Sequence, residues 1–142
     1  MKWNQLIATS FVVIGVLLSF NAVALTEEVN GIKWTYTVSR GNAEIGDGHD
    51  NAIDDKTAGG ITIPSCLGGC PVTSVGQYAF YDCEYIKSVA MPDSVTNINK
   101  CAFKNCHRLE SVSIGRGVNT IGIDAFSECR NLKAVYISDL AA

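Results

Sequence analysis

The sequence contains no cluster of basic residues and none of the short motifs that mark common catalytic sites. Lysine and arginine together number 11 against 14 aspartate and glutamate residues, which gives a net charge of −3. A nucleic-acid-binding surface needs concentrated positive charge, so this balance argues against such a partner. The motifs G-x-S-x-G and H-E-x-x-H and the phosphate-binding P-loop are also missing. We therefore predict that the protein is not an enzyme and that it carries no cofactor.

The chain also lacks an uninterrupted apolar run of membrane-spanning length. Its one candidate, residues 6–20, is short for a span and includes Ser19. It follows a basic start and precedes Ala22-Val23-Ala24, which has the small residues of a signal-peptidase site. We predict a signal peptide over residues 1–24, cleaved after Ala24; the alternative is an uncleaved membrane anchor. The mature protein would be secreted, or would lie at the cell surface or in the periplasm.

What the sequence does contain is a repeat of fixed length in its second half. Ala-Phe pairs end at Phe80, Phe103 and Phe126, which are 23 residues apart, and the segments around them align without insertion. The aligned copies are residues 72–94, 95–117 and 118–140. A strict period of this length is typical of a solenoid, in which each copy forms one coil and neighbouring coils bury its apolar side.

Each copy can be divided by its pattern. Eight aligned positions are apolar or cysteine in all three copies, and polar residues lie between them. Residues 88–91 and their equivalents alternate polar or small with apolar, which predicts half-buried strands that stack into a parallel sheet. Residues 78–83 and their equivalents are expected to form a short helical or 3₁₀ turn with the phenylalanine pointing inward. Gly76, Asn99 and Gly122 share one position, which predicts left-handed backbone there.

These motifs carry a resemblance to a known family. The pattern V-T-S-V-G-x-x-A-F-x-x-C-x-x-I-x-S-V-x-x-P, read from Val72 to Pro92, resembles the BspA-type (Treponema-type) leucine-rich repeat. Segments 31–38 and 60–72 resemble the lead-in found before such arrays in secreted bacterial proteins. The resemblance implies a right-handed leucine-rich-repeat coil, an extracellular location and a role in binding or adhesion. The predicted fold class is an α/β solenoid of three full repeats, residues 72–140.

The segment before the repeats, residues 25–71, is predicted to be an N-terminal cap rich in β-structure. Trp34 and Tyr36 alternate with threonines, as in a strand. Ile61 and Ile63 match the strand positions Val89 and Met91, which indicates a degenerate first coil. Terminal repeats of a solenoid are expected to be atypical because one face meets water.

The six cysteines fall into two groups. Cys83, Cys106 and Cys129 occupy one repeat position, which predicts a ladder of buried, unreactive thiols. Cys66 and Cys70 bracket a flexible Leu-Gly-Gly segment, and in an oxidising compartment they are a candidate disulfide. Cys101 lies outside both groups and is expected to face solvent as an odd thiol able to cross-link two chains.

No metal site is predicted. Cys101, Cys106 and His107 lack a second ligand pair at zinc-finger spacing. The acidic residues of the loop at residues 46–59 suggest calcium but lack the order of an EF-hand, so a solvated turn is favoured. The residues considered for calcium are Asp47, His49, Asp50, Asp54 and Asp55.

The leading functional hypothesis is an exported module that recognises a protein or a glycan through the outward residues of the repeat strands. The candidate ligand face comprises Ser88, Ala90, Ser111, Ser113, Ala134 and Tyr136. This face has a single aromatic residue and no arginine, so we expect weak or multivalent binding. The alternative is an assembly module that associates end to end through its last strand, or a fragment of a longer array without its own ligand.

Overall fold

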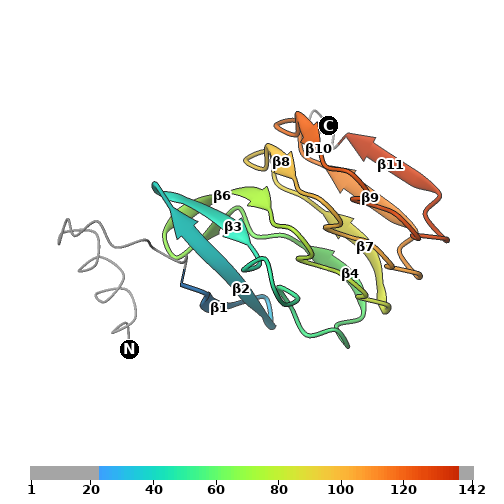
Figure 1. Ribbon diagram of the computed structural model, residues 1–142, viewed down its shortest axis with the longest axis horizontal. Helices are drawn as coiled ribbons and strands as arrows, with labels where there is room; N and C mark the ends of the chain where they lie inside the picture. Colours follow the sequence, from blue (N-terminus) through green and yellow to red (C-terminus); the bar gives the residue numbers. More distant parts are fainter. Residues whose placement is uncertain (1–22, 138–142) are drawn as a thin grey trace.

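The structure, a computed structural model, describes residues 23–137. These residues form short strands joined by turns, and none of them belongs to a helix (Figure 1). The strands are β1 Leu25–Val29, β2 Ile32–Ser39, β3 Asn42–Ile45, β4 Gly59–Thr62, β5 Cys66–Leu67, β6 Cys70–Val75, β7 Ile86–Ala90, β8 Asn97–Ile98, β9 Ser111–Ile114, β10 Thr120–Ile121 and β11 Ala134–Ile137. Within this part of the chain, no helix is therefore available to cross a membrane. The predicted signal peptide lies almost wholly outside the described residues.

The strands build two sheets that run along the coil. One is four-stranded, in the order β11-β9-β7-β4, and all of its pairs are parallel. The other has seven strands, in the order β1-β2-β3-β6-β8-β10, with β5 attached to β6. The pairs β3–β6, β6–β8 and β8–β10 are parallel, whereas β1–β2, β2–β3 and β5–β6 are antiparallel. Each turn of the coil thus contributes one strand to each sheet, as in a solenoid.

The strand register follows the sequence repeat. In the four-stranded sheet, Val89 lies opposite Val112, and Val112 lies opposite Val135. Strand β4 continues the sheet with Ile61 opposite Val89, which is the match expected from the sequence. Neighbouring coils therefore stack in register, so that side chains at the same position of the repeat lie one above another.

The aromatic position of the repeat forms a stack inside the coil. The rings of Phe80 and Phe103 lie 4.7 Å apart at 5°, and those of Phe103 and Phe126 lie 5.2 Å apart at 4°. Phe80 and Phe103 are fully buried. Trp34 of β2 meets Phe80 edge-on at 6.2 Å and closes the stack on the N-terminal side. The predicted inward placement of the phenylalanines is confirmed.

The predicted helical turn at residues 78–83 is wrong, and with it the α component of the predicted fold class. Backbone N–H groups there alternate between two kinds of partner. Tyr81 N donates to the Tyr78 carbonyl at 3.0 Å, whereas Phe80 N donates to the Ala102 carbonyl of the next coil at 2.8 Å. Tyr78 and Asp82 have left-handed φ values of 59° and 60°. A helix cannot form because hydrogen bonds between coils take every second donor and left-handed residues interrupt the segment.

The position shared by Gly76, Asn99 and Gly122 is not left-handed, contrary to expectation. The left-handed residues lie two positions later, as at Tyr78. Glycine is needed at position 76 for a different reason, since a Cβ there would lie 2.5 Å from the Ile45 carbonyl oxygen. At Gly122 it would lie 2.5 Å from the Lys100 nitrogen. Both glycines therefore permit a close approach between coils.

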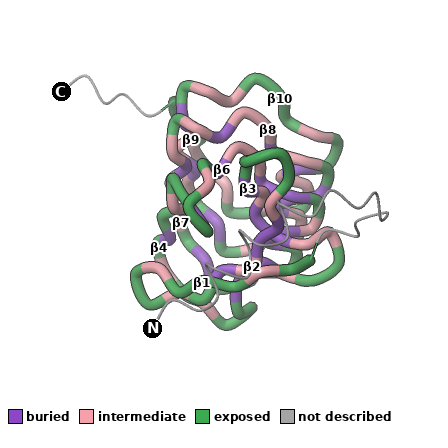
Figure 2. Tube along the Cα trace, turned by 90° about the vertical axis from the view of Figure 1, so that its left-hand side faces the viewer, coloured by how far each residue is buried: buried purple, intermediate pink, exposed green. Residues whose placement is uncertain are grey.

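Burial of the apolar positions decreases toward the C-terminal end of the described chain. Val75, Ile98, Val89, Val112 and Met91 are buried. Their equivalents in the last coil are exposed, as the tube around β10 shows (Figure 2). The exposed fractions are 52% for Ile121, 49% for Val135 and 66% for Ile137. The described coil thus presents core-type side chains at the end opposite β1.

Candidate functional site

The six residues of the candidate ligand face lie side by side on β7, β9 and β11. Two rows cross these strands: Ser88 is opposite Ser111, which is opposite Ala134, and Ala90 is opposite Ser113, which is opposite Tyr136. On β7 and β9 they flank the buried Val89 and Val112, so their side chains project from the outer face of the four-stranded sheet, and the register places the two residues of β11 in line with them. Their role in binding stays a prediction.

Strand β4 extends both rows, a contribution that the sequence reasoning missed. Gly60 lies opposite Ser88, and Thr62 lies opposite Ala90. Since Ile61 and Ile63 match buried strand positions, the alternation already placed Gly60 and Thr62 on the outer face. A Cβ on Gly60 would lie 2.7 Å from the Ser88 hydroxyl, so glycine keeps the first row flat. The face is therefore shallow, small in its side chains and uncharged.

A hollow of about 560 Å³ opens where the second row ends. Thr62, Ala90 and Ser113 of that row form one wall. The other walls come from the β1–β2 turn and from the loops after β4 and β7, with Val29, Asn30, Ile63, Pro64, Ser65, Cys66, Met91, Pro92 and Asp93. Asp93 is the one charged residue in the lining, and its carboxylate accepts the Arg116 backbone N–H at 2.8 Å. The hollow falls in the size range of ligand pockets.

A second hollow, of about 550 Å³, lies against the turns of the coil and has a polar lining. Tyr78 and Tyr81 meet edge-on in its wall at 5.7 Å. The remaining lining residues are His49, Asp50, Asn51, Cys101 and Lys104. The sequence does not indicate this hollow, because it joins the loop after β3 to turns of two coils.

The carboxylates considered for calcium serve as turn acceptors. Asp47 Oδ1 accepts the backbone N–H groups of His49 and Asp50 at 2.9 and 3.0 Å. These bonds, that of Asp50 first, hold the pKa of Asp47 below its usual value. Asp54 Oδ1 accepts the Lys56 N–H at 2.8 Å. Such bonds are those of Asx turns, which is the alternative that the sequence favoured.

The thiols of the repeat position are tied to the neighbouring coil. Cys106 Sγ donates to the Phe80 carbonyl at 3.1 Å, and Cys129 Sγ donates to the Phe103 carbonyl at 3.0 Å. Cys83 and Cys106 are fully buried, whereas Cys129 is half-buried. Burial raises the pKa of the Cys83 thiol to about 12. The hydrogen bond with Cys129, followed by burial, raises the pKa of Cys106. Cys83 and Cys106 are therefore poor nucleophiles, because the thiolate is the reactive form.

The expectation that Cys101 faces solvent is wrong. Its side chain is only 3% exposed. Cys101 occupies the left-handed turn position, with Tyr78 and Asp124 in the coils on either side. Its backbone N–H donates to the Ile123 carbonyl at 3.1 Å, which holds it between these coils. A cross-link between two chains through Cys101 would require this turn to open.

The candidate disulfide residues lie in a tight hairpin, and both thiols are free. Cys66 is opposite Pro71, and Leu67 is opposite Cys70, across the Gly68-Gly69 turn. Adjacent strand residues point to opposite faces, so the two thiols do not face each other in this register. The disulfide stays a prediction, and its formation requires the hairpin to shift.

Comparisons with known proteins identify the family to which the repeats belong. The family model described as "BspA type Leucine rich repeat region (6 copies)" matches residues 57–141. It is a family of repeats rather than of a catalytic domain. The match includes β4 as well as the three aligned copies. A search of proteins of curated function finds no match.

Solved structures show the same fold. A T. pallidum leucine-rich repeat protein is similar with a TM-score of 0.65 and 27% identity, over 72% of this chain and 46% of that one. A leucine-rich cell surface protein from Faecalibacterium prausnitzii gives 0.59 and 26%, over 80% and 30%. A leucine-rich repeat protein from Bacteroides ovatus gives 0.58 and 26%, over 77% and 28%. This chain thus spans less than half the length of each. With more than half of its residues matched by the family model, it belongs to the BspA-type leucine-rich repeat family.

Proposed function

We propose that the protein is an exported binding module that recognises a protein or a glycan at or outside the cell surface. The observation that carries this proposal is the outer face of the four-stranded sheet, which carries two rows of mostly small side chains, the second of which borders an open hollow of about 560 Å³. Parallel-stranded solenoid walls suit extended ligands because each coil adds one contact row.

The composition of this face sets the expected strength of binding. Interface residues that contribute most to affinity are commonly tryptophan, tyrosine and arginine. The face offers only Tyr136 of these, and that residue is half exposed. A shallow surface with one aromatic side chain supports weak single contacts, so function would rest on several copies acting together.

Location and segment roles belong to the same proposal. The signal-peptide pattern at residues 1–24 supports export, and a similar solved structure is described as a cell surface protein. Residues 25–71 would cap the coil, since Trp34 of β2 closes the aromatic stack. Residues 72–140 would form the recognition coils.

A multivalent binding assay tests the proposal. The purified protein, displayed as a tetramer, is applied to an array of glycans and purified extracellular-matrix proteins. We expect binding to at least one class of probe, and we expect S113D combined with Y136D to remove it because charge is placed on the second row. T120D is the matched control, since Thr120 is exposed on the other sheet. Undiminished binding by the double variant would rule out this face.

An assembly role is the second candidate, and the exposed end of the coil favours it. Ile121 and Val135 repeat positions that are buried in the preceding coils, Ile137 repeats a position that is buried or half-buried there, and among the described strands β11 lies at the edge of its sheet. Exposed edges and apolar patches promote association. A second copy, or a further coil of a longer array, would cover them. Sedimentation that shows only monomer at micromolar concentration would contradict self-association.

A further inference from the structure

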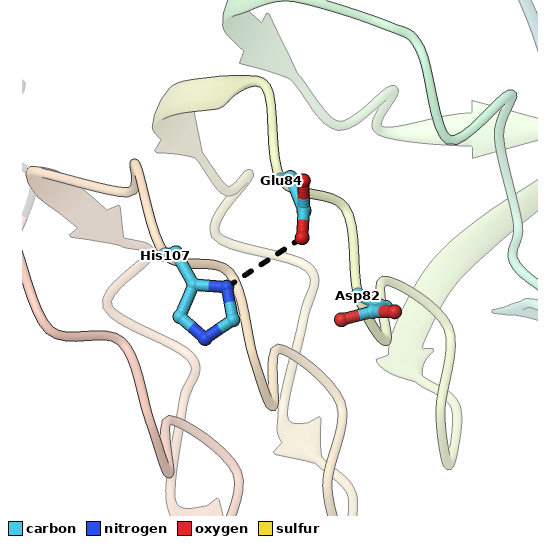
Figure 3. Close-up of side chains that lie close together, drawn as sticks. All are labelled: Asp82, Glu84 and His107. Atoms are coloured by element: carbon cyan, nitrogen blue, oxygen red, sulfur yellow. Dashed lines mark ion pairs between the residues drawn. The ribbon is translucent and has the colours of Figure 1, made fainter.

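Two carboxylates and one imidazole meet on the surface where two neighbouring coils turn toward the four-stranded sheet. Asp82 and Glu84 precede β7, and His107 precedes β9. One ligand atom from each lies within 4.8 Å of the other two. His107 Nδ1 lies 3.8 Å from Glu84 Oε1, and the Asp82 carboxylate lies next to them (Figure 3).

The three side chains combine donors that first-row transition metals accept. Imidazole nitrogen suits Zn²⁺, and carboxylate oxygens complete mixed sites of this kind. The group differs from a purely acidic cluster because the imidazole supplies a borderline nitrogen donor. It also differs from the zinc set considered from the sequence, since Cys101 and Cys106 are buried between coils and only His107 is common to both.

The separation of the donors fits a metal after small side-chain rotations. Ligands about 2.1 Å from a tetrahedral zinc ion lie roughly 3.4 Å from one another. The observed 3.8 Å between His107 and Glu84 is close to this spacing. Their side chains are 38% and 52% exposed, so they can rotate without moving the packed backbone. The backbone of Asp82 is held by its N–H bond to the Lys104 carbonyl at 2.9 Å.

The surroundings of the group favour a cation. In the last coil, Arg130 occupies the repeat position of Glu84 and His107, and Glu128 occupies that of Asp82. Arg130 supplies a positive charge there and pairs with Glu128 at 2.8 Å. Beside the group, the Arg108 guanidinium is engaged with the Tyr85 ring, with its central carbon 5.3 Å from the ring centroid. A divalent ion would relieve repulsion between Asp82 and Glu84.

We propose that Asp82, Glu84 and His107 form a surface site for a divalent transition metal of the Zn²⁺ type. The ion would join two adjacent coils, since the carboxylates come from one coil and the imidazole from the next. Three protein ligands leave a fourth position for water. The site would act as a clamp that stabilises the stack against opening between these coils.

Calorimetric titration of the purified protein with ZnCl₂ tests the site. The C66S background removes the exposed thiol, which could otherwise bind the metal. We expect one Zn²⁺ per chain and a melting temperature that rises with Zn²⁺ concentration. H107A and D82N should each weaken binding at least about tenfold, since loss of even a residue that only hydrogen-bonds to a metal ligand costs about that much. H49A is the matched control, since His49 is the other histidine of the chain, and it should bind as the parent does.

Co²⁺ provides a second measurement on the same variants. Oxygen and nitrogen donors give weak visible bands, whereas thiolate coordination adds strong near-ultraviolet absorption. The proposal predicts the weak bands alone and their loss in H107A. It is overturned if Zn²⁺ at millimolar concentration neither binds nor raises the melting temperature, if H107A binds as tightly as the parent, or if thiolate absorption appears. Circular dichroism spectra that match the parent confirm that the variants fold.

Discussion

Phe103 is the residue on which the interior of the coil depends most directly. Its ring lies between those of Phe80 and Phe126, and it is fully buried. We expect F103A to lower the free energy of unfolding by about 3–5 kcal/mol, because a cavity opens in the middle of the stack. Domain stabilities are typically about 5–15 kcal/mol, so cooperative unfolding should be lost or nearly lost. Thermal and urea denaturation followed by circular dichroism measure the change.

K104A, one residue along the chain, is the matched control for F103A. Lys104 lies in the wall of the polar hollow rather than in the core. Its removal should change stability by less than about 0.5 kcal/mol. Equal melting temperatures for F103A and K104A would contradict the inward position of the aromatic ring.

The Cys83 thiol makes the free energy of unfolding depend on pH in the alkaline range. Its folded-state pKa is about 12, raised first by burial from the usual 9.0. Below pH 9 both states keep the proton. Between pH 9 and about 12 the unfolded state releases it while the folded state retains it, so the free energy of unfolding falls as pH rises. Urea denaturation from pH 8 to pH 11 should show a shallower decline in C83A than in the parent.

C66A is the control for this pH dependence, because Cys66 is exposed. Its stability profile should parallel that of the parent after any constant offset. If C83A and C66A lose stability with the same slope between pH 9 and 11, the Cys83 thiol is not buried as described.

At the scale of elements, glycine 76 controls how closely the first turn approaches β3. A Cβ at this position would meet the Ile45 carbonyl oxygen at 2.5 Å, and the Gly76 N–H donates to the same oxygen at 2.8 Å. We expect G76A to cost about 1–3 kcal/mol, because backbone atoms must separate. G60A should cost less, since the nearest atom to its Cβ is the hydroxyl of Ser88, which can rotate. Chemical denaturation of the two variants provides the comparison.

The elements also show how far sequence reasoning reaches. The 23-residue period predicted the strand register and the phenylalanine stack because both depend on identical coils in register. The turn at residues 78–83 was predicted incorrectly because its donors bond to the following coil, a partner that local pattern does not reveal. Cys101 was misplaced because its burial comes from the coils on either side. The hollow beside Ala90 unites the β1–β2 turn with loops far along the chain.

At the scale of the whole molecule, stability should decline from the interior coils toward β10 and β11. The residues of β10 are exposed, and among the described strands β11 pairs with β9 alone. Local opening costs least where few apolar contacts are broken. Hydrogen exchange followed by mass spectrometry should therefore give the fastest amide exchange at residues 120–137 and the slowest around β7 and β9. Uniform protection along the repeats would indicate that the exposed end is covered by another chain.

The most direct test of the stacked coil is a nuclear Overhauser measurement on protein with selectively labelled phenylalanine rings. The stack places Phe80 beside Phe103 and Phe103 beside Phe126, with centroids 4.7 and 5.2 Å apart. We predict ring-to-ring cross-peaks for these two pairs and none between Phe80 and Phe126, which Phe103 separates. Missing cross-peaks for the adjacent pairs would contradict the in-register coil. Ring signals that a dissolved paramagnetic probe readily broadens would contradict it as well, because they would place the rings in contact with solvent.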